Sequence, residues 1–211
     1  MSSISQNIAA IRATLPQGVQ LVCVSKFHPA EAILEAYNAG ERDFGESRVQ
    51  ELCAKQSQLP KDIRWHFIGH LQTNKVRQIV PFVYLIHSVD SVHLMETINA
   101  EAARINRVVN ILLEVHTANE TTKSGFLPQE IKMLDLDLYP NLKVCGLMTM
   151  ATNTDDEVEI HRCFRLLNSL ADSDKHFLIL SMGMSDDYLL AIQDGANMVR
   201  IGTDIFGARQ Y

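Results

Sequence analysis

The sequence predicts an α/β fold, a single (β/α)8 TIM-type barrel with an extra N-terminal helix, which spans residues 1–211 as one domain. Three observations predict it. Short apolar or β-branched runs alternate with longer segments whose apolar residues recur at helical spacing, a pattern typical of parallel sheets. Eight such runs fit into 211 residues, which favours a closed barrel over an open doubly wound sheet. No stretch rich in proline, glycine or serine divides the chain.

The individual elements follow in order along the chain. The segment MSSISQNIAAIRATL has its apolar residues at helical intervals and predicts a first helix. Strands are expected at residues 21–25, 42–45, 64–69, 83–88, 108–115, 142–148, 176–181 and 197–202, with the weakest signal at 42–45. Helices are expected between them at residues 29–40, 47–59, 73–80, 91–105, 128–138, 155–171 and 185–195. Two of these helices close on a glycine, Gly40 and Gly195, and several begin at Ser, Thr or Asp.

The composition argues against several classes of function. Hydrophobic residues make up 46% and charged residues 21%, which is ordinary for a globular protein. The net charge of −6 and the lack of a basic run argue against nucleic acid as a partner. No run approaches the roughly 18 apolar residues of a membrane span, and the N-terminus lacks the apolar core of a signal peptide, so we expect a cytoplasmic protein. The four cysteines are scattered without metal-binding spacing, which predicts free thiols and no metal site.

Polar residues gather where the predicted strands end. In a parallel barrel all carboxyl ends open onto one face, so these residues would share one site. The exits carry Lys26, Glu46, His66 with Gly69 and His70, Ser88, Glu114 with His116, Met148 with Thr149, Ser181 to Ser185, and Arg200 with Gly202 and Thr203.

The last two exits, SMGMS at 181–185 and RIGT at 200–203, predict a phosphate site. Small residues such as Gly183 and Gly202 let backbone N–H groups approach an anion, and the hydroxyls of Ser185 and Thr203 add hydrogen bonds. Each segment alone could be an ordinary glycine turn. Together, after strands seven and eight, they occupy the place where barrels frequently hold a phosphate.

Lys26 stands at the tip of the first strand, in LVCVSK. One interpretation is that it marks the point where the strand meets water. The other is that it presents an amine to a carbonyl, because a lysine, a phosphate site and a cavity between them suit a phosphorylated aldehyde held as an imine. Pyridoxal 5′-phosphate (PLP) is the ligand that this combination indicates. The alternative is an aldolase-like barrel that forms a Schiff base with a sugar phosphate.

Arg200 precedes the predicted phosphate loop on the last strand. An arginine that donates to the pyridine nitrogen would keep that nitrogen unprotonated and weaken the ring as an electron sink. Such a site can carry the cofactor without driving carbanion chemistry strongly. The alternative for Arg200 is an ion pair with Glu46 or Asp204.

The motifs VSKFHP, FGESRVQE, WHFIGHLQTNK, IHSVDS, KSGF, GLMTM, LSMGMSDD and VRIGTDIFGAR occur in this order. As an ordered set they resemble the pyridoxal-phosphate-binding homeostasis proteins, the YggS/PROSC family. The resemblance implies a barrel similar to the N-terminal domain of alanine racemases, with PLP held as an internal aldimine on Lys26. It implies that Ser185, Gly202 and Thr203, within segments that include Ser181 and Gly183, bind the phosphate, and that Arg200 faces the pyridine nitrogen. Met148 and His66 would line the pocket.

Three departures from the family pattern concern the handover of the cofactor. SKFHP replaces the usual SKTKP, so His28 stands where a second lysine is common, and Ser47 replaces a pocket asparagine. The C-terminal lysine pair of some members is absent from GARQY. Lys123 in KSGF matches a family lysine that could serve as a secondary attachment point, or it is a solvated loop lysine.

These residues predict a carrier and not an enzyme. Racemisation needs proton donors on both faces of the substrate carbon, and in racemases the second donor comes from a C-terminal domain that we do not expect here. We therefore expect no catalytic residues, but a monomeric protein that holds PLP, supports vitamin B6 homeostasis and supplies PLP-dependent apo-enzymes. The alternatives are a PLP-dependent racemase-like enzyme or lyase, and a scaffold that regulates a partner.

Overall fold

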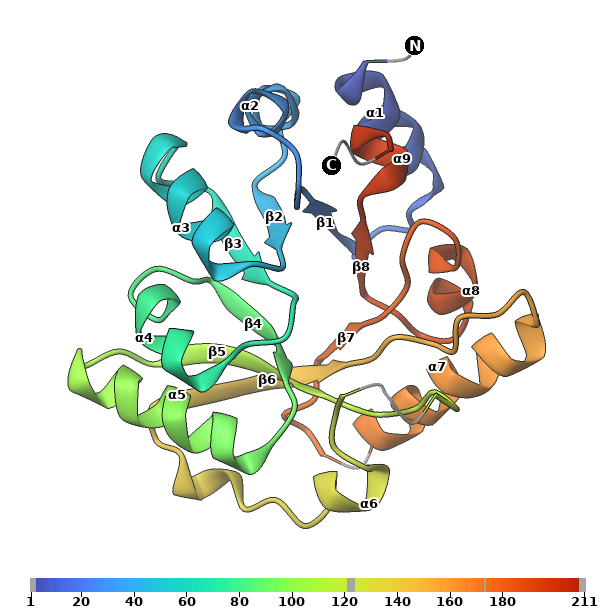
Figure 1. Ribbon diagram of the computed structural model, residues 1–211. Coiled ribbons are helices and arrows are strands. Elements are labelled where there is room, and N and C mark those ends of the chain that lie inside the picture. The colour runs from blue at the N-terminus through green and yellow to red at the C-terminus, as the bar shows by residue number, and fades with distance from the viewer. Residues whose placement is uncertain (1–2, 121–123, 173, 209–211) are drawn as a thin grey trace.

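Eight parallel strands close into a barrel in chain order, β1 to β8, in the computed structural model (Figure 1). The structure describes residues 3–120, 124–172 and 174–208. The strands are β1 (Gln20–Val24), β2 (Asp43–Glu46), β3 (Arg64–Phe67), β4 (Leu85–Val89), β5 (Val109–Glu114), β6 (Leu142–Met148), β7 (Ile179–Ser181) and β8 (Met198–Ile201). Each overlaps a predicted strand, with bounds that differ by a few residues. The predicted barrel is therefore confirmed, including its second strand.

Helices surround the barrel and connect its strands. They are α1 (Ile4–Thr14), α2 (Ala30–Asn38), α3 (Val49–Gln58), η1 (Thr73–Lys75), α4 (Val76–Ile79), α5 (Val92–Arg104), α6 (Pro128–Ile131), η2 (Leu136–Leu138), α7 (Glu157–Ala171), α8 (Tyr188–Gln193) and α9 (Thr203–Phe206). The extra N-terminal helix is confirmed as α1, which begins with a capping box between Ser3 and Gln6. It lies beside α9 (Figure 1), and the amide of Asn7 donates to the backbone oxygen of Ile205 at 2.9 Å.

The expected helix at residues 128–138 is the main difference from prediction, because it is divided into α6 and η2. The side chain of Asp135 accepts a hydrogen bond from the N–H of Asp137, a local turn that competes with helix continuation. Met133 is 82% exposed, so burial of its side chain does not stabilise a longer helix there. The expected helix at 73–80 similarly starts as η1 before it becomes α4.

Two apolar layers hold the fold together. The larger fills the space between the helices and the outside of the barrel, and the smaller lies inside the barrel around Val22, Leu85, Leu112, Met148 and Met198. Because side chains alternate between the two faces of a strand, the neighbours of these residues two positions along also point inward. That alternation brings polar residues into the barrel interior as well.

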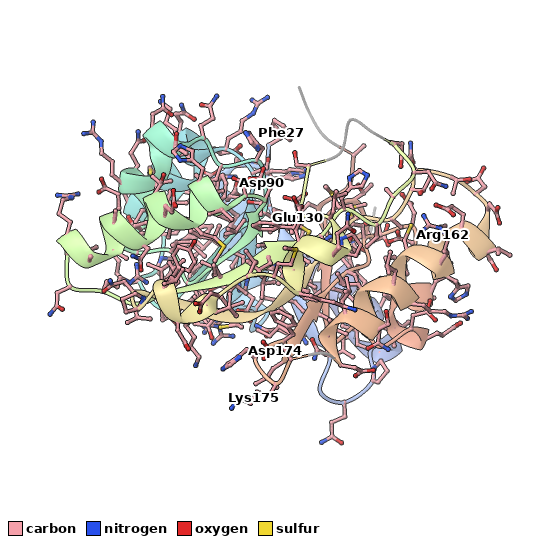
Figure 2. All side chains as sticks on the ribbon, turned by 90° about the horizontal axis from the view of Figure 1, so that it is seen from below. Phe27, Asp90, Glu130, Arg162, Asp174 and Lys175 are labelled. Atoms are coloured by element: carbon pink, nitrogen blue, oxygen red, sulfur yellow. The ribbon has the colours of Figure 1, made fainter. Side chains whose placement is uncertain are left out.

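The two ends of the barrel are chemically distinct. Figure 2 places Phe27 and Asp90, which follow β1 and β4, toward one edge of the molecule, and Asp174 and Lys175, which precede β7, toward the opposite edge. The carboxyl ends of the strands therefore share one face, as the barrel requires. No helix in the described ranges is long and apolar enough to cross a membrane.

Candidate cofactor-binding site

The carboxyl ends of the strands surround a cavity of about 210 Å³. Five of the predicted site residues line it, namely Lys26, Ser185, Arg200, Gly202 and Thr203. A larger hollow of about 610 Å³ lies at the other end of the barrel, among strand starts such as Gln20 and Lys143. We take the smaller cavity as the candidate site, because it collects an amine, a guanidinium and two hydroxyls.

Lys26 reaches the cavity from a strained turn. It lies two residues beyond the end of β1 and is half-buried. The next residue, Phe27, has a left-handed backbone conformation with φ of 67°, which is uncommon for a large side chain. Its N–H donates to Oε1 of Glu51 at 2.7 Å. This bond stabilises the turn and thereby sets the direction in which Lys26 leaves the strand.

A buried ionic cluster lies beneath this turn. Nζ of Lys55 donates to the backbone oxygen of Ser25 at 2.8 Å, to Oε1 of Glu46 at 2.7 Å and to Oε1 of Glu51 at 2.6 Å. The hydroxyl of Ser25 donates to the same oxygen of Glu46 at 2.6 Å. Burial raises the pKa of Glu46 to about 7, although the charge of Lys55 acts in the opposite direction. The cluster ties α3 to the end of β1 and so anchors the backbone that carries Lys26.

Arg200 reaches the same cavity from β8 and is only 4% exposed. Its Nη1 donates to the backbone oxygen and the hydroxyl of Ser181 at 2.7 and 2.6 Å, and its Nη2 donates to the backbone oxygen of Thr149 at 2.9 Å. Burial lowers the pKa of the guanidinium to about 10, so it stays cationic at neutral pH. Among the described residues Arg200 forms no ion pair with Glu46 or Asp204, so that alternative is not realised.

The loops after β7 and β8 form the predicted anion-binding side of the cavity. Gly183 adopts φ of 91°, which allows the first loop to turn sharply and present Ser185. At Gly202 a Cβ would lie 3.2 Å from the backbone oxygen of Val24, so the second loop passes close to the end of β1. Helix α9 begins at Thr203, and the first N–H groups of a helix lack intrahelical partners. Hydroxyls and backbone donors thus meet at one side of the cavity.

Two carboxylates oppose an anion on that side. Asp186 lines the cavity, and Asp204 lies in the first turn of α9. Burial and the charge of Asp186 raise the pKa of Asp204. Anion binding there consequently depends on the backbone and hydroxyl donors of the two loops.

The other predicted site residues lie farther from the cavity. Ser47 lines a separate hollow of about 200 Å³ beside Arg48. His66 and Met148 lie inside the barrel and are 0% and 1% exposed. Ser181 is fully buried behind Arg200. Lys123 lies outside the described residues.

Several residues that line the cavity were not selected from the sequence. They are Val24, Ile68, Met150, Met184, Asp186 and Gly207, together with His28, which the sequence marked only as a departure from the family pattern. A signal existed for Met150, because it lies two positions beyond Met148 and strand alternation places the two on one side. Apolar residues in loops such as Met184 carry no comparable signal.

The fold defines a class of protein, the barrels related to the N-terminal domain of alanine racemase. The family described as "Alanine racemase, N-terminal domain" matches residues 1–210. The solved alanine racemase of Clostridium difficile superposes with a TM-score of 0.82 at 13% identity, over 99% of this chain and 57% of that one. At that identity the likeness concerns the fold alone.

Closer relatives identify the family within this class. The pyridoxal phosphate homeostasis protein of Schizosaccharomyces pombe is 38% identical and covers 99% of this chain and 94% of its own length. That of Aquifex aeolicus is 43% identical over 91% of this chain and 88% of its own. PipY of Synechococcus elongatus, solved with PLP bound, is 37% identical with a TM-score of 0.87, over 97% of this chain and all (100%) of that one. The chain belongs to the pyridoxal phosphate homeostasis protein family.

Proposed function

We propose that this protein holds PLP on Lys26 and acts in intracellular PLP homeostasis and supply, as one barrel domain spanning residues 1–211. The observation that carries the proposal is the meeting of Lys26, Arg200 and the hydroxyls of Ser185 and Thr203 around one cavity. This donor set matches a ligand with a carbonyl, a ring acceptor and a phosphate. Membership of the family and the PLP-bound structure of PipY support it.

When bound, PLP supplies an aldehyde that condenses with an amine and a ring that withdraws electrons. Each residue of the cavity has a distinct role toward it. Lys26 provides the amine, and the loops at Ser185, Gly202 and Thr203 hold the phosphate. Arg200 would donate to the ring nitrogen, and because a guanidinium does not give up its proton, it would leave that nitrogen unprotonated. The residues therefore favour retention of PLP over carbanion chemistry.

The surroundings of the cavity favour a carrier over an enzyme. Racemisation requires a second proton donor opposite the lysine. Among the described residues that line the cavity, His28 is the sole imidazole, and no tyrosine is present. We therefore propose a cytoplasmic monomer without catalytic residues of its own, which shields PLP and passes it to PLP-dependent apo-enzymes. The alternative is a racemase-like enzyme that uses the same cofactor.

A protection and transfer assay tests the carrier function. The PLP-loaded protein is exposed to a phosphatase that destroys free PLP, and an apo-enzyme that needs PLP is then added. We expect the wild type to preserve PLP and to restore the activity of the apo-enzyme, and a Lys26→Ala variant to do neither. Equal loss of PLP with and without the protein would refute the carrier function.

The racemase-like alternative is tested on the same preparation. The loaded protein is incubated with L-alanine, and the formation of D-alanine is followed by chiral chromatography. The carrier proposal expects no sustained turnover. Turnover that scales with protein concentration and is lost in Lys26→Ala would favour the enzyme.

A further inference from the structure

A line of buried polar side chains crosses the barrel interior behind Arg200. Nη1 of Arg200 donates to Oγ of Ser181 at 2.6 Å, and this oxygen lies 2.9 Å from Nδ1 of His87. Nε2 of His87 lies 2.9 Å from Nδ1 of His66, and Nε2 of His66 lies 2.9 Å from Oδ1 of Asp43. We call Ser181, His87, His66 and Asp43 the interior chain. All four are buried, three of them at 0% exposure.

The interior chain ends in a carboxylate at the far end of the barrel. Asp43 and Arg64 are the first residues of β2 and β3, and Arg64 holds both oxygens of Asp43 at 2.7 and 2.5 Å. The side chain of Arg64 is 43% exposed, so this pair reaches the surface. Burial alone would raise the pKa of Asp43, but the hydrogen bonds from Arg64 and His66 hold it well below its usual range.

The carboxylate of Asp43 decides the direction of every hydrogen bond. A carboxylate only accepts, so Nε2 of His66 carries its hydrogen, and with both imidazoles neutral the hydroxyl of Ser181, which accepts from Arg200, donates to Nδ1 of His87. His87 then carries its hydrogen on Nε2 and donates to Nδ1 of His66. His66 in turn donates from Nε2 to the carboxylate of Asp43. In Ser181, His87 and His66 alike, the accepting atom faces Arg200 and the hydrogen-bearing atom donates toward Asp43.

The reversed direction fails at Asp43. It would place a bare Nε2 of His66 against the carboxylate of Asp43, so that two acceptors without a hydrogen between them would face each other at 2.9 Å. A doubly protonated imidazole is also disfavoured, because burial lowers the pKa of both His66 and His87. The interior chain therefore has one arrangement with two neutral imidazoles.

We propose that the interior chain is a positioning device for Arg200, which fixes the guanidinium so that its remaining N–H groups face the ring nitrogen of the cofactor. This rests on the proposed function. The barrel interior is ordinarily filled by branched apolar side chains, and a fully bonded polar line there adds rigidity. A proton relay is not supported, because Arg200 cannot accept a proton from Ser181. His66 and Ser181 thus act through Arg200 and do not touch the cofactor.

The test couples a variant of the interior chain to a change in the ligand. PLP and 1-deaza-PLP, in which carbon replaces the ring nitrogen, are titrated into wild type, His87→Phe and Ser88→Ala. Ser88 is the control, because it is a buried neighbour on β4 whose hydroxyl donates to the backbone oxygen of Gly69. We expect His87→Phe to weaken PLP about tenfold, the size of one lost hydrogen bond to a charged group, and to leave 1-deaza-PLP within about twofold.

The outcomes separate this inference from the proposed function. If the wild type binds neither ligand, the proposed function fails. If the wild type binds both and His87→Phe weakens both equally, the histidine is merely structural and the positioning role is refuted. Should His87→Phe not fold, ¹⁵N NMR of the wild type decides, since the inference requires hydrogen on Nε2 and none on Nδ1 in both His66 and His87. Hydrogen on Nδ1 of either residue would overturn it.

Discussion

Replacement of Gly183 by alanine should destabilise the fold and displace the loop after β7 that borders the candidate site. Gly183 has φ of 91°, and an added Cβ would lie 2.7 Å from Cβ of Ala191 and 2.8 Å from Cα of Tyr188. A side chain in the left-handed region costs about 1–2 kcal/mol, and overpacking against a helix costs about 1–3 kcal/mol. We therefore expect Gly183→Ala to lower the free energy of unfolding by about 2–5 kcal/mol.

The control for this variant is Gly40→Ala. Gly40 also has a left-handed conformation, with φ of 107°, but no heavy atom lies within 4 Å of the Cβ position. It should lose only the conformational part, about 1–2 kcal/mol. Urea unfolding measures both losses, and the difference between them isolates the steric overlap with α8.

Gly183→Ala should also weaken cofactor binding. The backbone oxygen of Gly183 accepts from the N–H of Arg200 at 3.0 Å, so displacement of the loop disturbs both the anion-binding side and the guanidinium. PLP titration should show weaker binding in Gly183→Ala and unchanged binding in Gly40→Ala. Equal unfolding losses in the two variants, together with unchanged PLP affinity for Gly183→Ala, would refute the reasoning.

Two further predictions concern carboxylates. Burial raises the pKa of Glu114 from 4.5 to about 7. The protonated carboxyl therefore stabilises the folded state most below pH 4.5, and this contribution is lost as the pH rises through 7. Relative to Glu114→Gln, the free energy of unfolding of the wild type should fall by about 3 kcal/mol across this window. Urea unfolding at both ends of the window measures this, and a constant difference would contradict it. Glu51→Ala removes the acceptor of the strained Phe27 N–H and should slow the formation of the borohydride-reducible adduct at Lys26; an unchanged rate would mean that the turn holds without Glu51.

The architecture was predictable because strand and helix periods alternate without interruption. Even the short strand β2 was predicted from the run at residues 42–45, although its signal was the weakest of the eight. The helix at 128–138 was wrong because Asp135 and Asp137 form a local turn that helical spacing of the apolar residues does not reveal.

The lining of the cavity was predictable where a polar or charged residue follows or ends a strand, as at Lys26 and Arg200. The lining was less predictable where it depends on how far along the barrel axis a side chain lies. The sequence does not show that His66 lies deeper in the barrel interior than the residues that line the cavity. The cluster beneath Lys26 was missed for a related reason. Glu51 and Lys55 have the spacing of an ordinary surface pair on a helix, and the contact with the end of β1 appears only when α3 packs against the barrel.

The central claim is that β1 presents Lys26 to PLP. Its most direct test is borohydride reduction of the PLP-loaded protein, followed by peptide mapping, with Lys26→Ala treated in parallel. The account predicts a reduced PLP adduct on Lys26 in the wild type and its loss in the variant. An adduct on a different lysine in the wild type, or no adduct after incubation with PLP, would contradict it.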